Sequence, residues 1–486
     1  MTLSGSPHHA RLSAAALAEL IGAAAPSDPR VPVSGATHHS GRVRPGDAFF
    51  ALPGADHHGI VHADAALSAG AALIVSDRPH PMGLAVADPG AALLRLGRFA
   101  RGRLTGPVVG VTGSAGKTTA RALLAAALDA EASEGNLNTP HALAGRLVRA
   151  WNDDAGRPLV LELGIDRIGE MAELTELVRP DVGLITSIAA SHLDGLRDEA
   201  TVAHEKAGLL RAAPRGLAAD AAWGTLPREL SDRIVRYGLS GGAPGDAPGD
   251  APGDALWRAR LQGGNADDRP RDGDALDGDA LDGDALDGDA VLGDPFAPVL
   301  ILERPERHRG VRVRLPGVGR GLAESAVGAL ATAALLGVPL DAAARRLEGA
   351  ALEPGRLQLR RLGSLTVIDD SYNANPVSAR QALELLRAAP APRVAVLGEM
   401  LELGDDAARY HRALGEATRG LELVLFHGPH GDAVRSGNPE AQVLDDATIR
   451  ASVSRLPREG TILIKASRGM RFERLVAALT ESEPAS

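Results

Sequence analysis

The chain has 486 residues, of which 44% are hydrophobic and 23% charged, and it contains no Cys. This composition is typical of a globular protein of about three domains, and it excludes disulfides, Cys-ligated metals and thiol nucleophiles. No apolar run approaches the roughly 18 residues of a membrane span, and the first residues do not resemble a signal peptide. We therefore expect a cytoplasmic protein without a membrane span. The net charge of −10 falls within one internal segment, so the rest of the chain gives no sign of nucleic-acid binding.

The first informative pattern lies in residues 40–52. Pro45 and Gly46 predict a turn, and Phe49 to Leu52 predict a strand that follows it. A turn and a strand occur in many proteins, so this pattern by itself assigns no function.

Residues 110–119 read Gly-Val-Thr-Gly-Ser-Ala-Gly-Lys-Thr-Thr, after the β-branched pair Val108-Val109 and before a helix-like run to Ala130. A strand, a glycine turn and a helix in this order form a phosphate cradle, because backbone N–H groups and the helix N-terminus face the anion. Lys117 would reach the β- and γ-phosphates, and Thr118 would hold Mg²⁺. Val111 replaces the first Gly of the usual pattern, so this loop is a variant. The predicted nucleotide contacts are Gly113, Ser114, Ala115, Gly116, Lys117, Thr118 and Thr119.

Two further buried strands are predicted at residues 159–164 and 182–188. Glu162 ends the first, and the second leads to His192. The carboxyl ends of parallel strands converge on the ligand crevice, so Glu162 and His192 could both reach a metal ion near the phosphates.

Lysine is rare, since Lys117, Lys206 and Lys465 are the only three among 52 basic residues. An amine can lose its proton and react, whereas a guanidinium cannot, so each Lys is a candidate for a position that requires an amine. Lys206 lies in a predicted helix over residues 201–210. A solvated helix Lys paired with a nearby acid is the alternative interpretation.

The segment from Gly241 to Pro295 contains 14 Asp and 4 Arg but no Glu or Lys, and this accounts for the whole net charge. Ala-Pro-Gly-Asp repeats and Ala-Leu-Asp-Gly-Asp repeats bury too little apolar surface to offset the entropy of ordering, so we predict disorder. A calcium-binding repeat is the alternative. Such repeats have a period of about nine residues, whereas this one repeats every five.

Four further blocks follow in the C-terminal third: Pro354-Gly-Arg-Leu357, Val367-Ile-Asp-Asp-Ser-Tyr-Asn-Ala-Asn-Pro376, Val394-Ala-Val-Leu-Gly-Glu-Met-Leu-Glu-Leu-Gly404 and Ile462-Leu-Ile-Lys-Ala-Ser-Arg-Gly-Met470. Together with the phosphate loop, these blocks resemble those of the Mur ligase family, in the family's order. The segment with Ser40 is similar to the family's N-terminal block. The C-terminal blocks resemble the branch of the family that adds a dipeptide.

The resemblance implies an α/β protein of three domains, with a central P-loop ATPase-type parallel sheet and a C-terminal Rossmann-like domain. We expect a UDP-MurNAc-peptide-binding domain over residues 1–104 and an ATP-binding domain over residues 105–350. The disordered insert would occupy about residues 241–295 of the second domain, and a ligase domain would span residues 351–486. A monomer is expected.

The resemblance also implies an ATP-dependent ligase that joins D-alanyl-D-alanine to UDP-MurNAc-tripeptide through an acyl phosphate. Thr118 and Glu162 would bind one Mg²⁺, and His192 with Lys206, carbamylated by CO₂, would bind a second. By the same resemblance, Arg356, Asp370 and Asn373 would contact the nucleotide, and Ser40, Asn136 and Asn375 would contact the other substrates.

Several positions depart from the family's pattern. His39-Ser40-Gly41 replaces an Asp-Ser-Arg sequence, and Gly321 and Ser325 stand where the family has the His and Asn that meet adenine. Two alternatives therefore remain: another ligase of the superfamily, or a nucleotide-binding module that has lost ligation. Retention of Lys206 argues against the second, because a module without chemistry has no evident need for a carbamylated Lys.

Overall fold

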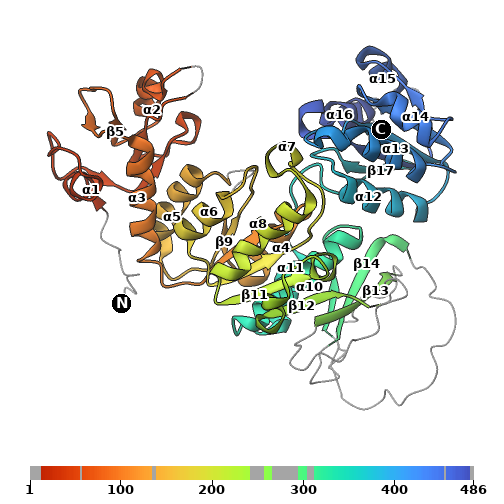
Figure 1. The fold of residues 1–486 in the computed structure, drawn as a ribbon, viewed down its shortest axis with the longest axis horizontal. Helices are drawn as coiled ribbons and strands as arrows, with labels where there is room; N and C mark the ends of the chain where they lie inside the picture. Colours follow the sequence, from red (N-terminus) through yellow and green to blue (C-terminus); the bar gives the residue numbers. More distant parts are fainter. Residues whose placement is uncertain are drawn as a thin grey trace.

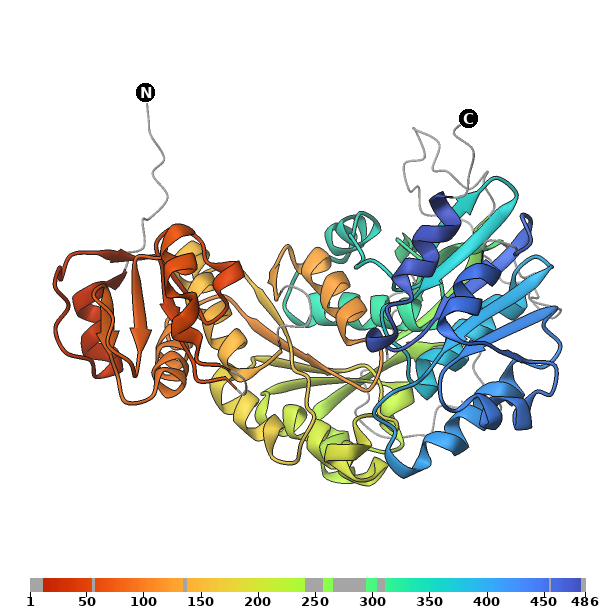
Figure 2. The ribbon, with the colours of Figure 1, turned by 90° about the horizontal axis from the view of Figure 1, so that it is seen from above.

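The computed structural model describes residues 12–54, 57–133, 138–240, 257–264, 294–303, 311–453 and 456–481. It consists of three α/β domains that follow one another along the chain, with the N-terminal and C-terminal domains at opposite ends of the central one (Figures 1 and 2). In this described part, no helix combines the length and the apolar character needed to cross a membrane.

The N-terminal domain is built on a four-stranded parallel sheet in the order β3-β4-β5-β6. Buried Phe49 and Phe50 lie on β4, as the apolar run predicted. The strands are β3 (Gly35–Thr37), β4 (Asp47–Phe50), β5 (Leu73–Ser76) and β6 (Gly83–Ala85), beside a small pair of β1 (Leu12–Ser13) and β2 (Pro32–Val33). The helices are α1 (Ala14–Ile21), α2 (Ala63–Ser68) and α3 (Pro89–Arg101).

The central domain holds a nine-stranded sheet in the order β15-β14-β13-β12-β11-β10-β7-β9-β8. Seven strands run parallel: β7 (Val108–Thr112), β8 (Glu131–Ala132), β9 (Leu159–Glu162), β10 (Val182–Ile185), β11 (Arg215–Ala219), β12 (Ile234–Leu239) and β13 (Trp257–Gly264). The antiparallel strands β14 (Asp294–Glu303) and β15 (Val311–Arg314) complete one edge.

Helices cover both faces of this sheet. One apolar cluster packs α4 (Lys117–Leu128), α10 (Arg320–Leu335) and α11 (Leu340–Glu348) against one face. The opposite face carries α5 (Pro140–Asp154), α6 (Glu170–Val178) and α8 (Glu199–Ala212), and the short α7 (Leu193–Leu196) and α9 (Asp220–Trp223) lie in the connections. The second apolar cluster continues without a break into the N-terminal domain, from Leu12 to Ile234. The first two domains therefore share one core.

The C-terminal domain contains a six-stranded sheet in the order β16-β17-β21-β18-β19-β20, parallel except for β16. Its strands are β16 (Gln358–Leu362), β17 (Leu365–Asp370), β18 (Arg393–Gly398), β19 (Leu423–His427), β20 (Gln442–Val443) and β21 (Gly460–Lys465). Two apolar clusters pack on its faces, and one of them also includes Val318 from the segment before α10. The helices are α12 (Pro376–Ala388), α13 (Ala407–Ala417), α14 (Gly431–Gly437), α15 (Asp446–Val453) and α16 (Glu473–Glu481).

The structure corrects the predicted extent of the insert. Residues 257–264 form β13, which lies parallel to β12 and antiparallel to β14. Apolar Trp257, Ala259 and Leu261 alternate with Arg on this strand, and Ala259 is fully buried. This alternation has the period of a strand. It was not recognised in the sequence because the segments on both sides are rich in Asp and Gly. The prediction of disorder was therefore wrong for this stretch, and both sets of repeats lie outside the described residues.

Candidate active site

A cavity of about 310 Å³ lies where the C-terminal domain faces the phosphate loop of the central domain. Most of the residues predicted from the sequence line it: Ser114, Ala115, Gly116, Lys117, Thr118, Thr119, Glu162, His192, Arg356, Asp370, Asn373 and Asn375. These residues come from both domains. The cavity is therefore complete only when the two domains are together.

The phosphate loop joins β7 to α4, as predicted, and its shape depends on glycine. Gly116 has φ +81°, and Gly113 has φ +155°. A Cβ atom at Gly113 would lie 2.0 Å from the Thr186 hydroxyl, so no side chain fits there. Thr186 and Ser187, which follow β10, brace the loop: the Ser187 hydroxyl accepts a 2.8 Å hydrogen bond from the Ala115 N–H, and the Thr186 hydroxyl donates to the Ala115 carbonyl.

Lys117 begins α4 and folds back over the loop. Its Nζ donates a hydrogen bond of 2.8 Å to the carbonyl of Gly113. Burial lowers the pKa of Lys117 from its ordinary value, and the nearby Glu162 carboxylate opposes this shift. The hydrogen bond to Gly113 holds the amine beside the phosphate loop, and Lys117 lines the cavity there. In this position the amine could interact with a phosphate.

Thr118 and Glu162 meet beside the loop, and both are buried. The Thr118 hydroxyl donates a 2.9 Å hydrogen bond to Glu162 Oε2. Arg121, one turn further along α4, lies 3.7 Å from the same carboxylate oxygen and forms an ion pair with Glu353, at the start of the C-terminal region. A hydroxyl and a carboxylate in contact at the end of a cavity are the oxygen donors that Mg²⁺ prefers.

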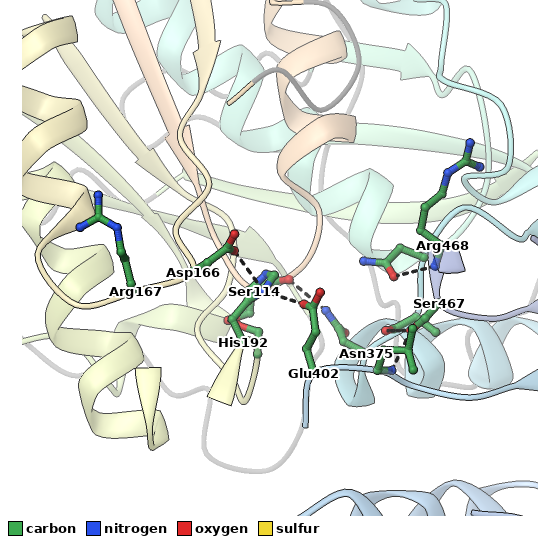
Figure 3. Close-up of polar contacts among 12 residues, drawn as sticks. Ser114, Asp166, Arg167, His192, Asn375, Glu402, Ser467 and Arg468 are labelled. Atoms are coloured by element: carbon green, nitrogen blue, oxygen red, sulfur yellow. Dashed lines mark hydrogen bonds and ion pairs between the residues drawn. The ribbon is translucent and has the colours of Figure 1, made fainter. Parts of the chain in front are cut away.

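His192 lies between two carboxylates (Figure 3). Its Nδ1 is 3.2 Å from Asp166 Oδ1 and 2.6 Å from Glu402 Oε2, and Glu402 belongs to the C-terminal domain. The hydrogen bond to His192 lowers the pKa of Glu402. The backbone of His192 adopts the left-handed region, with φ +52°, which is uncommon for a residue other than Gly.

Lys206 lies on α8 and is fully buried. Burial lowers its pKa to about 7, and the positive charge of Lys117 adds to this effect, whereas Asp166 opposes it. Lys206 is not among the cavity-lining residues, although two residues that line the cavity, Lys117 and Asp166, influence its pKa. No side chain in the described part of the chain forms a hydrogen bond or ion pair with its amine.

The C-terminal domain contributes the opposite wall of the cavity. Asn375 caps α12 and its side-chain amide donates a 2.9 Å hydrogen bond to the Ser114 carbonyl in the phosphate loop (Figure 3). Arg356 stacks on the ring of Tyr372 at 4.1 Å. Its buried Nε atom has no hydrogen-bond partner among the described residues. Buried polar groups are normally hydrogen-bonded, so an unpaired guanidinium nitrogen beside the cavity indicates a binding site for an anionic ligand.

Asp370 and Asn373 line the cavity but already have partners. Lys465 forms an ion pair with Asp370 and donates a 2.9 Å hydrogen bond to the Asn373 carbonyl. Burial raises the pKa of Asp370, and Lys465 opposes this shift. The Asn373 side chain accepts a hydrogen bond from the backbone N–H of Arg468. Lys465, the third rare Lys, therefore holds this wall together.

One predicted substrate residue, Ser40, lies away from the central cavity. Ser40 begins a short 3₁₀ helix (Ser40–Arg42) in the N-terminal domain. Ser40 does not line the central cavity, and it does not line a second, smaller cavity that includes its neighbours His39 and Arg42. That second cavity, of about 80 Å³, lies between residues 36–44 and α5 and includes Arg42, Arg44 and Arg149. Asn136 lies outside the described residues. Asn138, two residues further on, does line the central cavity.

Several residues of the central cavity were not predicted from the sequence. Asp166 and Asn138 come from the central domain, and Tyr372, Lys465 and Arg468 come from the C-terminal domain. Each of them lies within two residues of a predicted motif or site residue, and Asn138 is two residues from Asn136. Proximity to these positions was therefore the available signal.

A second group of potential metal ligands, Glu399, His411 and His430, lies at the carboxyl end of β18. His411 Nδ1 is 2.7 Å from the Ala407 carbonyl, and its Nε2 accepts a 3.0 Å hydrogen bond from the Met400 N–H. The rings of His411 and His430 stack in parallel. Both nitrogens of His411 are thus engaged with the backbone, and this cluster braces the loop that follows β18.

Two parts of the chain match known protein domains. Residues 111–250 match the Mur ligase middle domain, and residues 355–468 match the Mur ligase glutamate ligase domain. The chain is 28% identical to the UDP-N-acetylmuramoyl-tripeptide–D-alanyl-D-alanine ligase of Escherichia coli (strain K12), over 91% of this chain and 92% of that protein. It is 26% identical to the ligase of the same name from Bacillus subtilis (strain 168), over 89% and 90%.

Solved structures agree with these matches. MurF from Acinetobacter baumannii superposes with a TM-score of 0.77 at 25% identity, over 98% of this chain and all of that one. The MurF ligase of Thermotoga maritima in complex with ADP shares the fold, with a TM-score of 0.71 at 23% identity, over 92% and 97%. A phosphate loop on a parallel sheet, closed by a third α/β domain, defines an ATP-dependent ligase of three domains. The chain belongs to the Mur ligase family.

Proposed function

We propose that this protein joins D-alanyl-D-alanine to UDP-MurNAc-tripeptide at the expense of ATP, in the synthesis of peptidoglycan precursors. The observation that carries the proposal is the convergence of the phosphate loop, Glu162, His192 and the C-terminal residues Arg356 and Asn375 on one cavity. The proposal is consistent with the names of the relatives that match nearly the whole chain.

The donor set around the cavity fits Mg²⁺. Thr118 and Glu162 lie in contact and are buried, and His192 lies at the same cavity. Thr118 and Glu162 would hold one cation, and His192 with Lys206 would hold a second. When bound, the cations neutralise charge on the phosphates.

Carbamylation of Lys206 is part of the proposal. Only the neutral form of an amine adds to CO₂, and a pKa of about 7 makes much of this amine neutral at cellular pH. The carbamate would convert a buried cation into an oxygen ligand, which would also relieve the unfavourable interaction with Lys117.

The reaction would proceed in two steps. The terminal carboxylate of the tripeptide attacks the γ-phosphorus of ATP, the bond to the bridging oxygen of ADP breaks, and an acyl phosphate forms. Lys117 stabilises the charge on the transferred group. The amine of the dipeptide then attacks the acyl carbon, loses a proton and expels phosphate, so that an amide remains.

The C-terminal wall would protect the intermediate. Asn375 contacts the phosphate loop directly, and Arg356 with Tyr372 lines the opposite side of the same cavity. Holding both substrates here supplies proximity and keeps water away from the activated acyl group. Asp370 and Asn373 would contribute to the nucleotide side, and Ser40 and Asn136 to UDP-MurNAc-tripeptide. We further propose domain boundaries near residues 104 and 350, a monomeric state, and a cytoplasmic location where ATP is available.

The test is release of phosphate by the purified protein with ATP, Mg²⁺ and UDP-MurNAc-tripeptide, with and without D-alanyl-D-alanine. We expect sustained release that requires both peptide substrates and is lost in Lys206→Arg, which cannot form a carbamate. Release that does not depend on the dipeptide, by a protein that binds ATP, would contradict the proposed function. A panel of other amino acids and dipeptides would then test the alternative of a related ligase.

A further inference from the structure

Glu402, in the loop after β18, contacts His192, in the segment before α7. Glu402 Oε2 is 2.6 Å from His192 Nδ1, closer than the 3.2 Å of Asp166 Oδ1 (Figure 3). Asp166 belongs to the same domain as His192, whereas Glu402 reaches it from the C-terminal domain. The position of the Glu402 carboxylate therefore depends on how the two domains are arranged.

The two backbones also meet at this point. The Leu193 N–H donates a 3.2 Å hydrogen bond to the Glu402 carbonyl. A Cβ atom at Gly404 would lie 3.3 Å from Asp194 Oδ1, so the approach is close. Nearby, the Tyr410 hydroxyl donates a 3.1 Å hydrogen bond to Glu199, at the start of the helix that carries Lys206.

Both partners have unusual backbone conformations. His192 has φ +52° and Glu402 has φ +63°, although neither is Gly. Such conformations are strained and persist where the surrounding structure holds them. Their occurrence on both sides of a single contact between domains points to a function for that contact.

The contact also determines which nitrogen of His192 is free. A carboxylate at Nδ1 accepts its proton, so the Nε2 lone pair remains available. In the described part of the chain, no residue forms a hydrogen bond with Nε2. A carboxylate on the far nitrogen of a metal-binding His is the arrangement that fixes the ring and raises its basicity.

We propose that Glu402 is a positioning residue that orients His192 toward the divalent cation when the C-terminal domain closes. This proposal rests on the proposed function in one respect, which is the assignment of His192 as a ligand of the second cation. It links closure of the third domain to completion of that site, because without Glu402 the His192 ring would keep only the longer contact with Asp166.

The experiment compares Glu402→Ala, Glu402→Gln and Tyr410→Phe. Tyr410→Phe is the matched control, because it removes a hydrogen bond from the same interface without touching His192. Binding of Mn²⁺, which has a paramagnetic signal, is measured by electron paramagnetic resonance in the presence of a non-hydrolysable ATP analogue. The radius of gyration of each complex is measured by small-angle X-ray scattering.

We expect Glu402→Ala to weaken Mn²⁺ binding at the second site by about 10- to 100-fold. Glu402→Gln should recover part of this loss, because the amide oxygen still accepts the Nδ1 proton. Tyr410→Phe should bind Mn²⁺ as the unaltered protein does. If the contact only held the two domains together, the radius of gyration would increase in both Glu402→Ala and Tyr410→Phe. Mn²⁺ binding would then be the same in Glu402→Ala and Glu402→Gln.

Unchanged Mn²⁺ affinity in Glu402→Ala would overturn the proposal, as would an equal loss in all three variants. The test separates this proposal from the proposed function. Binding of Mn²⁺ and nucleotide is measured without either peptide substrate, so a protein that failed to ligate D-alanyl-D-alanine would still show whether Glu402 orients His192.

Discussion

Lys206 holds an amine in a fully buried position, and burial lowers its pKa to about 7. In the unfolded chain the pKa of a Lys is about 10.4. Between these two values the unfolded state binds more protons than the folded state, so this residue makes the free energy of unfolding rise as pH increases from about 7 to about 10. Below pH 7 the amine is charged in both states and contributes no pH dependence.

We therefore predict that Lys206→Met removes this rise. The Tm of the unaltered protein, measured in bicarbonate-free buffer, should increase relative to that of Lys206→Met between pH 7 and pH 9. A constant difference over this range would show that the folded state does not lower the pKa of Lys206. Lys465→Met provides a comparison at a second buried Lys, which is paired with Asp370.

Arg356 lines the central cavity. Its buried Nε lacks a partner among the described residues, while its guanidinium stacks on Tyr372. A charge-assisted hydrogen bond to a phosphate contributes about 1.5–3 kcal/mol, which is about 10- to 150-fold in affinity. Arg356→Gln should weaken ATP binding, measured by titration calorimetry, within this range and leave the Tm without ligand nearly unchanged. ATP binding of unaltered strength would rule out this role.

Residues of the site were predictable where a motif combined several residue types. The loop from Gly113 to Thr119 was recognisable as a phosphate loop, because glycines, an amine and a hydroxyl occur at fixed spacing between a strand and a helix. Asp166 and Glu402 were not predicted. A single carboxylate gives no signal by itself, and the contact of Glu402 with His192 depends on how two domains come together, which local sequence does not encode.

At the scale of elements, strands and helices around the site formed where the sequence indicated. The predicted strands at residues 159–164 and 182–188 correspond to β9 and β10, and the predicted helix at residues 201–210 lies within α8. These are long or strongly apolar segments next to clear turns. β13 escaped prediction because its eight residues lie within a segment rich in Asp and Gly.

β13 leads to a prediction about the insert. β13 pairs with both β12 and β14, and Gly264 lies opposite Asp294 in the register with β14. A two-residue Asn-Gly turn could therefore join these strands in place of residues 265–293. We expect this shortened protein to keep its phosphate-release activity and its Tm within a few degrees.

Deletion of residues 243–294 provides the contrasting variant. It removes β13 together with the repeats, so β12 loses one of its two partner strands and buried Ala259 is lost from the core. We expect a markedly lower Tm, measured by circular dichroism. Equal stability of the two deletions would show that β13 does not contribute to the sheet.

At the scale of the whole molecule, the two boundaries between domains differ in chemistry. The N-terminal and central domains share one continuous apolar cluster. The described contacts between the central and C-terminal domains include polar ones, such as Glu402 with His192, Asn375 with Ser114, and Tyr410 with Glu199. Apolar burial resists separation, whereas single hydrogen bonds and exposed ion pairs contribute little each. The C-terminal domain should therefore move against a rigid pair.

Pairs of spin labels can test this expectation, because the chain contains no Cys and each introduced Cys is labelled alone. Exposed positions are available on all three domains, at Ala25, Asp153 and Ala413. The distance between labels at Ala25→Cys and Asp153→Cys should stay the same when a non-hydrolysable ATP analogue and Mg²⁺ are added. The distribution between Asp153→Cys and Ala413→Cys should narrow, because the ligand holds the polar interface closed. Movement of the first pair on ligand binding would show that the shared core does not fix the N-terminal domain.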